Sequence, residues 1–95
     1  MNVDVLNFKT PYEVSMEIAK KAKEKRKYLK LTQMQLAEKS GVSLGSLKRF
    51  ERTGEISLSS LLKIAVILDS LKEFEGLFEK TEYTDIEEIL NDKNR

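Results

Sequence analysis

The stretch "LTQMQLAEKSGVSLGSLKRFERTG", residues 31–54, holds two short helical patterns with barely a turn between them. Thr32 and Ser43 precede the two patterns, and each hydroxyl can cap a helix by accepting a hydrogen bond from an orphan backbone N–H. Because the two caps are so close, the first helix must end near Ser40, with Gly41 as the left-handed residue that follows it. The spacing predicts a helix over about 32–40 and a second over about 43–52.

The same start signal occurs three times along the chain. In each copy a hydroxyl residue stands between two apolar residues five positions apart, which can pack together as a hydrophobic staple. The copies are Leu31-Thr32…Leu36, Val42-Ser43…Leu47 and Ile56-Ser57…Leu61. Gln35 adds a capping box to Thr32, and Gly54 marks the end of the second helix. A further helix is therefore expected from Ser57 to about Leu68, with Leu61, Leu62, Ala65 and Leu68 facing inward.

Two more helices are expected outside this region. Thr10, Pro11 and Glu13 form the capping signal of a first helix, whose inward face would carry Val14, Ile18, Ala22 and Leu29. A fifth helix would start at Ser70, boxed by Glu73, and carry Leu71, Phe74, Leu77 and Phe78. Thr84 with Glu87 signals a last short helix in the tail.

No stretch alternates with period two, so the chain is predicted to be all-α. The expected organisation is a flexible segment 1–9, a compact five-helix domain 10–80, and a tail 81–95 with an extra short helix.

Composition argues against several classes of protein. The 95 residues suffice for one small domain, and they include no His and no Cys. Without these residues or a glycine-rich phosphate loop, we expect no enzyme, no metal site, no cofactor and no small-molecule substrate. No apolar run is long enough to span a membrane, and the N-terminus lacks the pattern of a signal peptide. A cytoplasmic location is the expectation.

Charge is sorted along the chain. The net charge of +1 combines about +6 over residues 1–63 with about −5 over residues 64–95. A basic front half suggests a polyanionic partner, although sorted solvent-exposed helix faces would give the same pattern.

The 31–54 stretch, followed by "ISLSSLLKIAVIL", resembles the lambda-repressor/Cro-like family, also called XRE-type helix-turn-helix regulators. The features that carry this resemblance are Thr32-Gln33, Leu36-Ala37, Gly41, Ser43 and Leu47, with Glu51 after Phe50. The resemblance covers roughly residues 14–78. It implies a sequence-specific double-stranded DNA-binding transcription regulator, usually a repressor, whose recognition helix (about 43–52) lies in the major groove.

Several side chains would project from the start of that helix, namely Leu44, Gly45, Ser46, Lys48 and Arg49. The resemblance implies phosphate contacts from Gln33, Ser43, Ser46 and Arg52, and base contacts from Leu44, Gly45, Ser46 and Arg49. Arg49 is the strongest candidate, because a guanidinium can pair bidentately with guanine. Leu44 and Gly45 depart from the family pattern, which often has amides there. Neither side chain can donate a hydrogen bond, although Leu44 could contact a thymine methyl group.

Arg26 and Glu51 match a pair that links the first helix to the end of the recognition helix in the family. The pair would orient that helix if it were buried, whereas an exposed pair would contribute little.

Two kinds of protein partner are considered. Family members commonly bind DNA as homodimers, and Leu77, Phe78, Tyr83, Ile86, Ile89 and Leu90 offer a seam. The same residues could instead close the core of the monomer. The 41–68 stretch also resembles HipB-like antitoxins, which repress their own operon and bind a HipA-like kinase toxin. An autoregulating antitoxin with a toxin partner is therefore the alternative function.

Overall fold

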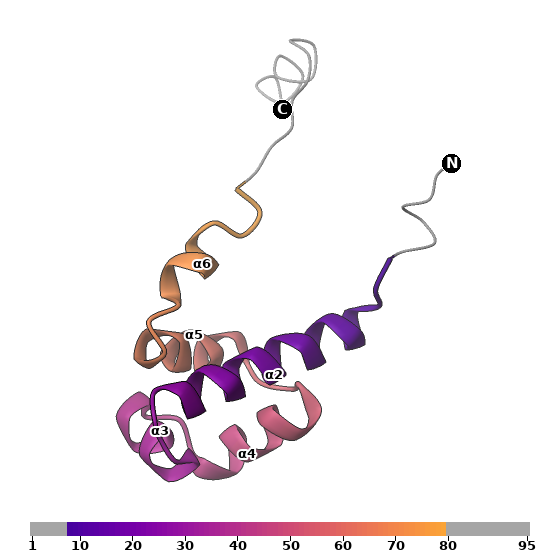
Figure 1. Ribbon diagram of the computed structural model, residues 1–95. Coiled ribbons are helices and arrows are strands. Elements are labelled where there is room, and N and C mark those ends of the chain that lie inside the picture. The colour runs from indigo at the N-terminus through magenta and orange to yellow at the C-terminus, as the bar shows by residue number, and fades with distance from the viewer. Residues whose placement is uncertain (1–7, 80–95) are drawn as a thin grey trace, which may run out of the picture.

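A computed structural model describes residues 8–79, which form five helices and no strand. The all-α prediction is thus confirmed for this part of the chain (Figure 1). The helices are α2 (Pro11–Tyr28), α3 (Gln33–Ser40), α4 (Leu44–Thr53), α5 (Leu58–Ile67) and α6 (Leu71–Glu75). The helix expected in the 81–95 tail and most of the 1–9 segment lie outside the described residues.

Side-chain caps start the first four of these helices, as their sequence signals predict. Thr10 with Glu13 and Thr32 with Gln35 both form complete capping boxes. Ser43 and Ser57 each accept a hydrogen bond from the backbone N–H three residues later. Each cap stabilises its helix by on the order of 1 kcal/mol, which matters most for helices as short as α3. Local sequence therefore determines where each of these helices begins.

Glycine ends the two helices at the centre of the fold. Gly41 follows α3 with φ of 78°, and Gly54 follows α4 with φ of 79°. A residue with a Cβ would be strained in this left-handed conformation, so glycine allows the chain to leave each helix in a tight turn.

The start of α6 differs from the prediction. Ser70 makes no side-chain cap, because its backbone (φ −128°, ψ 11°) does not take the extended conformation of the other four capping residues. Its hydroxyl donates to the Leu68 carbonyl oxygen at 3.1 Å. The helix ends at Glu75, so Leu77 and Phe78 follow it rather than belonging to it. The capping-box prediction at Ser70 is therefore wrong.

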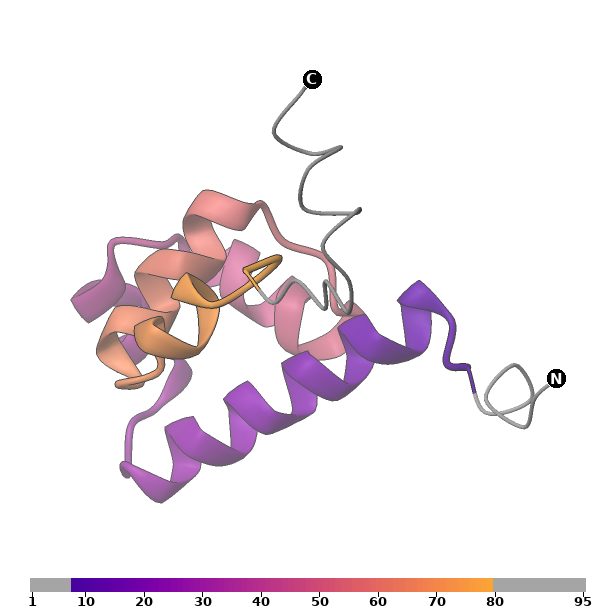
Figure 2. The ribbon, with the colours of Figure 1, turned by 90° about the horizontal axis from the view of Figure 1, so that it is seen from above.

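The core lies where four helices meet. α2 packs on α4, α3 packs on both α4 and α5, and α6 packs on α5 (Figure 2). Leu36, Leu47, Phe50 and Ile64 are each only 1% exposed and form the centre of this core. Ala37 lies beside them, and its small side chain allows α3 to approach its neighbours closely. Leu61 and Leu62, predicted to face inward, are half-buried, and Ile64 takes the deepest position on α5 instead.

The buried face of α2 matches the apolar pattern only in part. Ala22 is partly buried against the core, as predicted. Val14, Ile18 and Leu29 remain 41%, 36% and 40% exposed. Ala19 is completely buried instead, and Arg26, at the same face, is 7% exposed. The reason lies in tertiary packing: α4 packs on the side of α2 that carries Arg26, and Arg26 is paired there with Glu51. No helix within residues 8–79 is long and apolar enough to cross a membrane.

Candidate nucleic-acid interface

The second helix of the tight pair, α4, has two distinct sides. Leu47 and Phe50 face the core, whereas the opposite side is exposed to solvent. The exposed residues of α4 are Gly45, Ser46, Lys48, Arg49 and Arg52. A Cβ at Gly45 would meet no atom within 4 Å, so nothing in the protein crowds this part of the surface. The side of α4 that carries three cations is therefore open to a partner.

Leu44 does not belong to the exposed residues of α4, which corrects the expectation from the sequence. The sequence suggested that it projects from the helix start, but its side chain is half-buried and packs against the core. Leu44 packs against the buried cluster that includes Val42 and Leu47, so its side chain is not free to project from the helix start.

The start of α4 presents a hydroxyl with a free proton. Ser43 Oγ accepts from the backbone N–H of Ser46 at 3.1 Å and donates its own proton to Ser46 Oγ at 2.9 Å. The proton of Ser46 is not used in this pair, so Ser46 can donate to an external acceptor. Its position at the positive end of the α4 dipole favours an anionic acceptor such as a phosphate oxygen.

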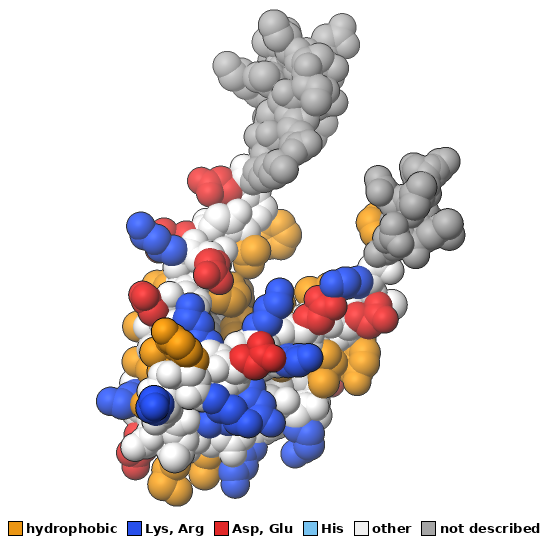
Figure 3. Space-filling view, viewed as in Figure 1, with side chains coloured by type: hydrophobic (Ala, Val, Ile, Leu, Met, Phe, Trp, Pro, Cys, Tyr) orange, Lys and Arg blue, Asp and Glu red, His pale blue; other side chains and the backbone are white. Residues whose placement is uncertain are grey.

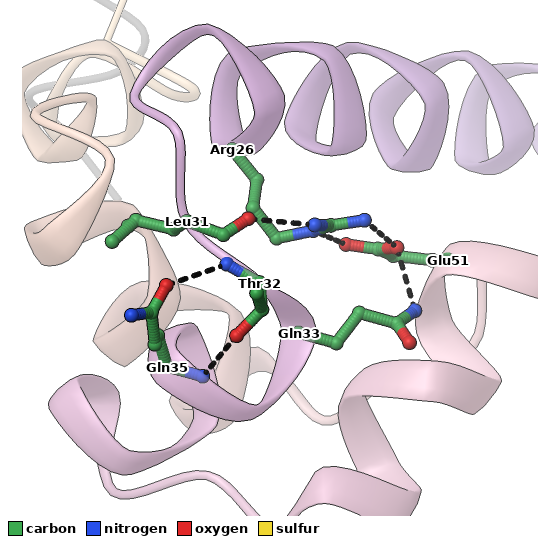
Figure 4. A network of polar contacts seen from close by, with 6 residues as sticks. All are labelled: Arg26, Leu31, Thr32, Gln33, Gln35 and Glu51. Atoms are coloured by element: carbon green, nitrogen blue, oxygen red, sulfur yellow. Dashed lines mark hydrogen bonds and ion pairs between the residues drawn. The ribbon is translucent and has the colours of Figure 1, made fainter.

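Arg26 and Glu51 form a buried ion pair between α2 and α4 (Figure 4). Their side chains are only 8% and 4% exposed. Arg26 Nε donates to Glu51 Oε2 at 2.7 Å and Nη2 donates to Oε1 at 3.0 Å, a bidentate arrangement. Arg26 Nη1 also donates to the carbonyl oxygen of Leu31 at 2.8 Å, in the loop before α3.

Gln33 extends this network to α3. Its Nε2 donates to Glu51 Oε1 at 2.9 Å, so donors from α2 and α3 both bond to the carboxylate of Glu51 on α4 (Figure 4). Among residues 8–79, no buried side-chain polar atom lacks a hydrogen-bond partner. A fully satisfied network of this kind fixes the orientation of α4 relative to α2 and α3. Sequence reasoning paired Arg26 with Glu51 but did not place Gln33 beside them.

Arg49 also has an intramolecular partner. Its Nη2 donates to Glu55 Oε1, and both side chains are well exposed, at 62% and 64%. Sequence reasoning did not single out Glu55. The signal that could have found it is Gly54, because a left-handed residue after α4 turns the chain back toward the last turn of the helix.

The other cations of the α4 surface are not paired in this way. Neither Lys48 nor Arg52 forms an ion pair with another residue of the described range. Lys and Arg side chains are spread over α2, α3 and α4, whereas acidic side chains predominate near α6 (Figure 3). In the described residues the charge sorting of the sequence is therefore partial, because acidic side chains also lie among the cations of α2 in this view.

Comparison with known proteins agrees with this geometry. A family model described as helix-turn-helix matches residues 23–74, which is more than half of the chain. The match includes all of α3, α4 and α5. A search of curated proteins returned no match. The chain belongs to the lambda-repressor/Cro-like (XRE-type) helix-turn-helix family of DNA-binding transcription regulators.

Proposed function

We propose that the protein is a sequence-specific repressor that reads double-stranded DNA with the exposed side of α4. The observation that carries this proposal is the arrangement of α4 itself. Its apolar side is locked into the core by Leu47 and Phe50, and its cationic side faces solvent. The buried Arg26–Glu51 pair holds this orientation, and the major groove of DNA is wide enough to admit an α-helix such as α4.

Each exposed residue then has a role set by its chemistry. Arg49 reads guanine, since its guanidinium matches the O6 and N7 acceptors. Ser46 donates to a phosphate or a base, and Ser43 lies beside it at the helix start. Lys48 and Arg52 neutralise phosphates, which strengthens binding to every sequence. Gly45 lets the helix backbone approach the bases closely, and Leu44 contributes a small apolar contact at the rim.

Gln33 contacts a phosphate in this proposal while it remains in the buried network. An amide NH₂ group has two protons, and only one is needed for Glu51. Gln33 would thus connect a DNA strand directly to the residue that orients α4. Its loss should affect both phosphate binding and the position of the recognition helix.

The test is selection of bound sites from random duplex DNA, followed by measurement of affinity between about 50 and 200 mM salt. Arg52→Ala should weaken binding to all sequences alike and reduce the salt dependence by about one ion. Arg49→Ala should instead flatten the preference at one base pair, a loss of about 1–3 kcal/mol of discrimination. Equal loss on every sequence from Arg49→Ala would remove it from the reading role, and no DNA binding at low salt would overturn the proposal.

Repression is the simplest result of such binding, because a protein that covers a promoter excludes polymerase. A reporter gene placed behind the selected site should lose expression when the protein is present. Increased expression would instead identify an activator.

Binding as a homodimer is part of the proposal, with two α4 helices about 34 Å apart on one face of the duplex. Apolar side chains exposed on and after α5 and α6 support a contact between copies, namely Val66, Leu71, Leu77 and Phe78. Sedimentation at micromolar concentration, with and without residues 81–95, tests this contact. A protein that is monomeric in both forms would favour closure of its own core by the same residues.

The alternative function is that of an autoregulating HipB-like antitoxin. The same exposed apolar surface would then bind a kinase-like toxin as well as, or instead of, a second copy. A kinase-like toxin encoded by the adjacent gene and recovered in a pull-down would support this alternative. An unrelated neighbour together with no captured partner would contradict it.

A further inference from the structure

We propose that Glu55 competes with DNA for the side chain of Arg49 and thereby limits the affinity of the protein for its sites. This inference rests on the proposed function, in which Arg49 contacts a base. It assigns Glu55 a positioning role, because Glu55 acts through Arg49 and not by touching the DNA itself.

The position of Glu55 is fixed by its backbone and does not depend on the ion pair alone. Thr53 Oγ1 donates to the carbonyl oxygen of Arg49 at 2.8 Å and accepts from the backbone N–H of Glu55 at 3.2 Å. The Thr53 hydroxyl therefore links the backbone of Glu55 to the backbone of Arg49. The carboxylate of Glu55 is held within reach of the Arg49 guanidinium for this reason.

Packing against α2 constrains the same turn from the other side. Gly54 lies so close to α2 that a Cβ at this position would be 3.0 Å from the backbone carbon of Ser15. Gly54 thus packs directly against α2, which limits how far the turn before Glu55 can move. Arg49 and Glu55 also line a shallow pocket between α4 and the start of α5, together with Ser46 and Ser57.

The energetics make the competition measurable but weak. Both side chains are more than three-fifths exposed, and an exposed ion pair changes an equilibrium by about fivefold at most, or ~1 kcal/mol. Guanine gives a bidentate contact of greater strength, so cognate DNA can take Arg49 from Glu55. Release leaves an unpaired carboxylate near the phosphates, which adds repulsion that is independent of Arg49.

A double-mutant cycle separates these two effects. Affinity for the selected duplex is measured at low salt for the wild type, Glu55→Gln, Arg49→Ala and the double variant. Glu55→Gln removes both the competition and the repulsion in the wild-type background, but only the repulsion when Arg49 is absent. We expect the gain in affinity to be about two- to fivefold larger in the wild-type background. Glu75→Gln on α6 makes the same change in net charge away from this pair, and its effect should not depend on Arg49.

The outcomes distinguish the inference from the proposed function. Equal gains in the two backgrounds, or weaker binding by Glu55→Gln, would overturn the competition while leaving DNA binding intact. A wild-type protein that ignores the duplex at low salt would overturn the proposed function and this inference with it. Urea denaturation of all variants checks that each is folded, which the exposure of both side chains leads us to expect.

Discussion

The molecule contains two Arg–Glu pairs on or beside α4, and their surroundings give them opposite roles. Arg26 and Glu51 are buried, bidentate and joined by Gln33 and the Leu31 carbonyl. Arg49 and Glu55 form a single contact in open solvent. The first pair cannot separate without leaving a charge in the interior, whereas the second exchanges one hydrated partner for another at small cost. Arg and Glu therefore form a permanent structural contact between α2 and α4 in the buried pair, and a reversible contact in the exposed pair.

The largest expected effect tests the buried pair. Arg26→Met leaves the Glu51 carboxylate in the interior with only Gln33 as a partner, so we expect a loss of about 3–5 kcal/mol in the free energy of unfolding. Urea denaturation measures this loss. The matched control is Arg26→Met combined with Glu51→Leu, which should recover most of the stability because no lone charge remains. A loss below about 1 kcal/mol from the single variant would mean that the pair is solvated after all.

The next largest effect is expected at Gly54, in the turn between Glu51 and Glu55. Gly41 and Gly54 have nearly the same positive φ, but only Gly54 is crowded, by the backbone of Ser15. Gly41→Ala should cost about 1–2 kcal/mol for the left-handed backbone alone. Gly54→Ala adds a steric clash with α2 to that strain, so its loss should be clearly larger in the same urea assay. Equal losses would show that the contact between the turn and α2 yields easily.

A smaller effect is expected from the exposed pair. Glu55→Ala removes the ion-pair partner of Arg49. Both side chains are exposed to solvent, so the free energy of unfolding should fall by less than about 1 kcal/mol. The comparison is with Glu51→Ala in the same assay, which strands the buried Arg26 guanidinium. Comparable losses from the two variants would contradict the contrast between the pairs.

The smallest effect concerns a third pair, which links the segment before α2 to α2 itself. Lys9 Nζ lies 2.7 Å from Glu17 Oε2, and this contact lowers the pKa of the Glu17 carboxyl and raises the pKa of the Lys9 amine. The stabilisation is present above the ordinary carboxyl pKa of about 4.5, is lost as the pH falls through the lowered pKa, and is lost again as the pH rises through the raised pKa of Lys9. An NMR titration should show the pKa of Glu17 rising toward its ordinary value in Lys9→Ala. An unchanged pKa would mean that the contact is not maintained in solution.

Helix starts and stops were predictable because they depend on neighbours in sequence. A hydroxyl cap, its staple and a following glycine lie within a few residues of each other, so the caps at Thr32, Ser43 and Ser57 form as expected. The one helix start that was predicted wrongly is the cap at Ser70. Ser70 follows the buried Leu68 closely, and its backbone does not take the extended conformation of the other capping residues, so its hydroxyl bonds to the Leu68 carbonyl oxygen and does not cap α6.

The sequence by itself determined the all-α class, the tight helix pair and the open side of α4, since each follows from short-range spacing and apolar pattern. Only the tertiary structure decided which face of α2 is buried, that Gln33 joins Glu51, and that Glu55 returns to Arg49. These facts depend on how closely separate helices approach and where a turn directs the chain. Periodicity along one helix holds no information about the distance to the next one.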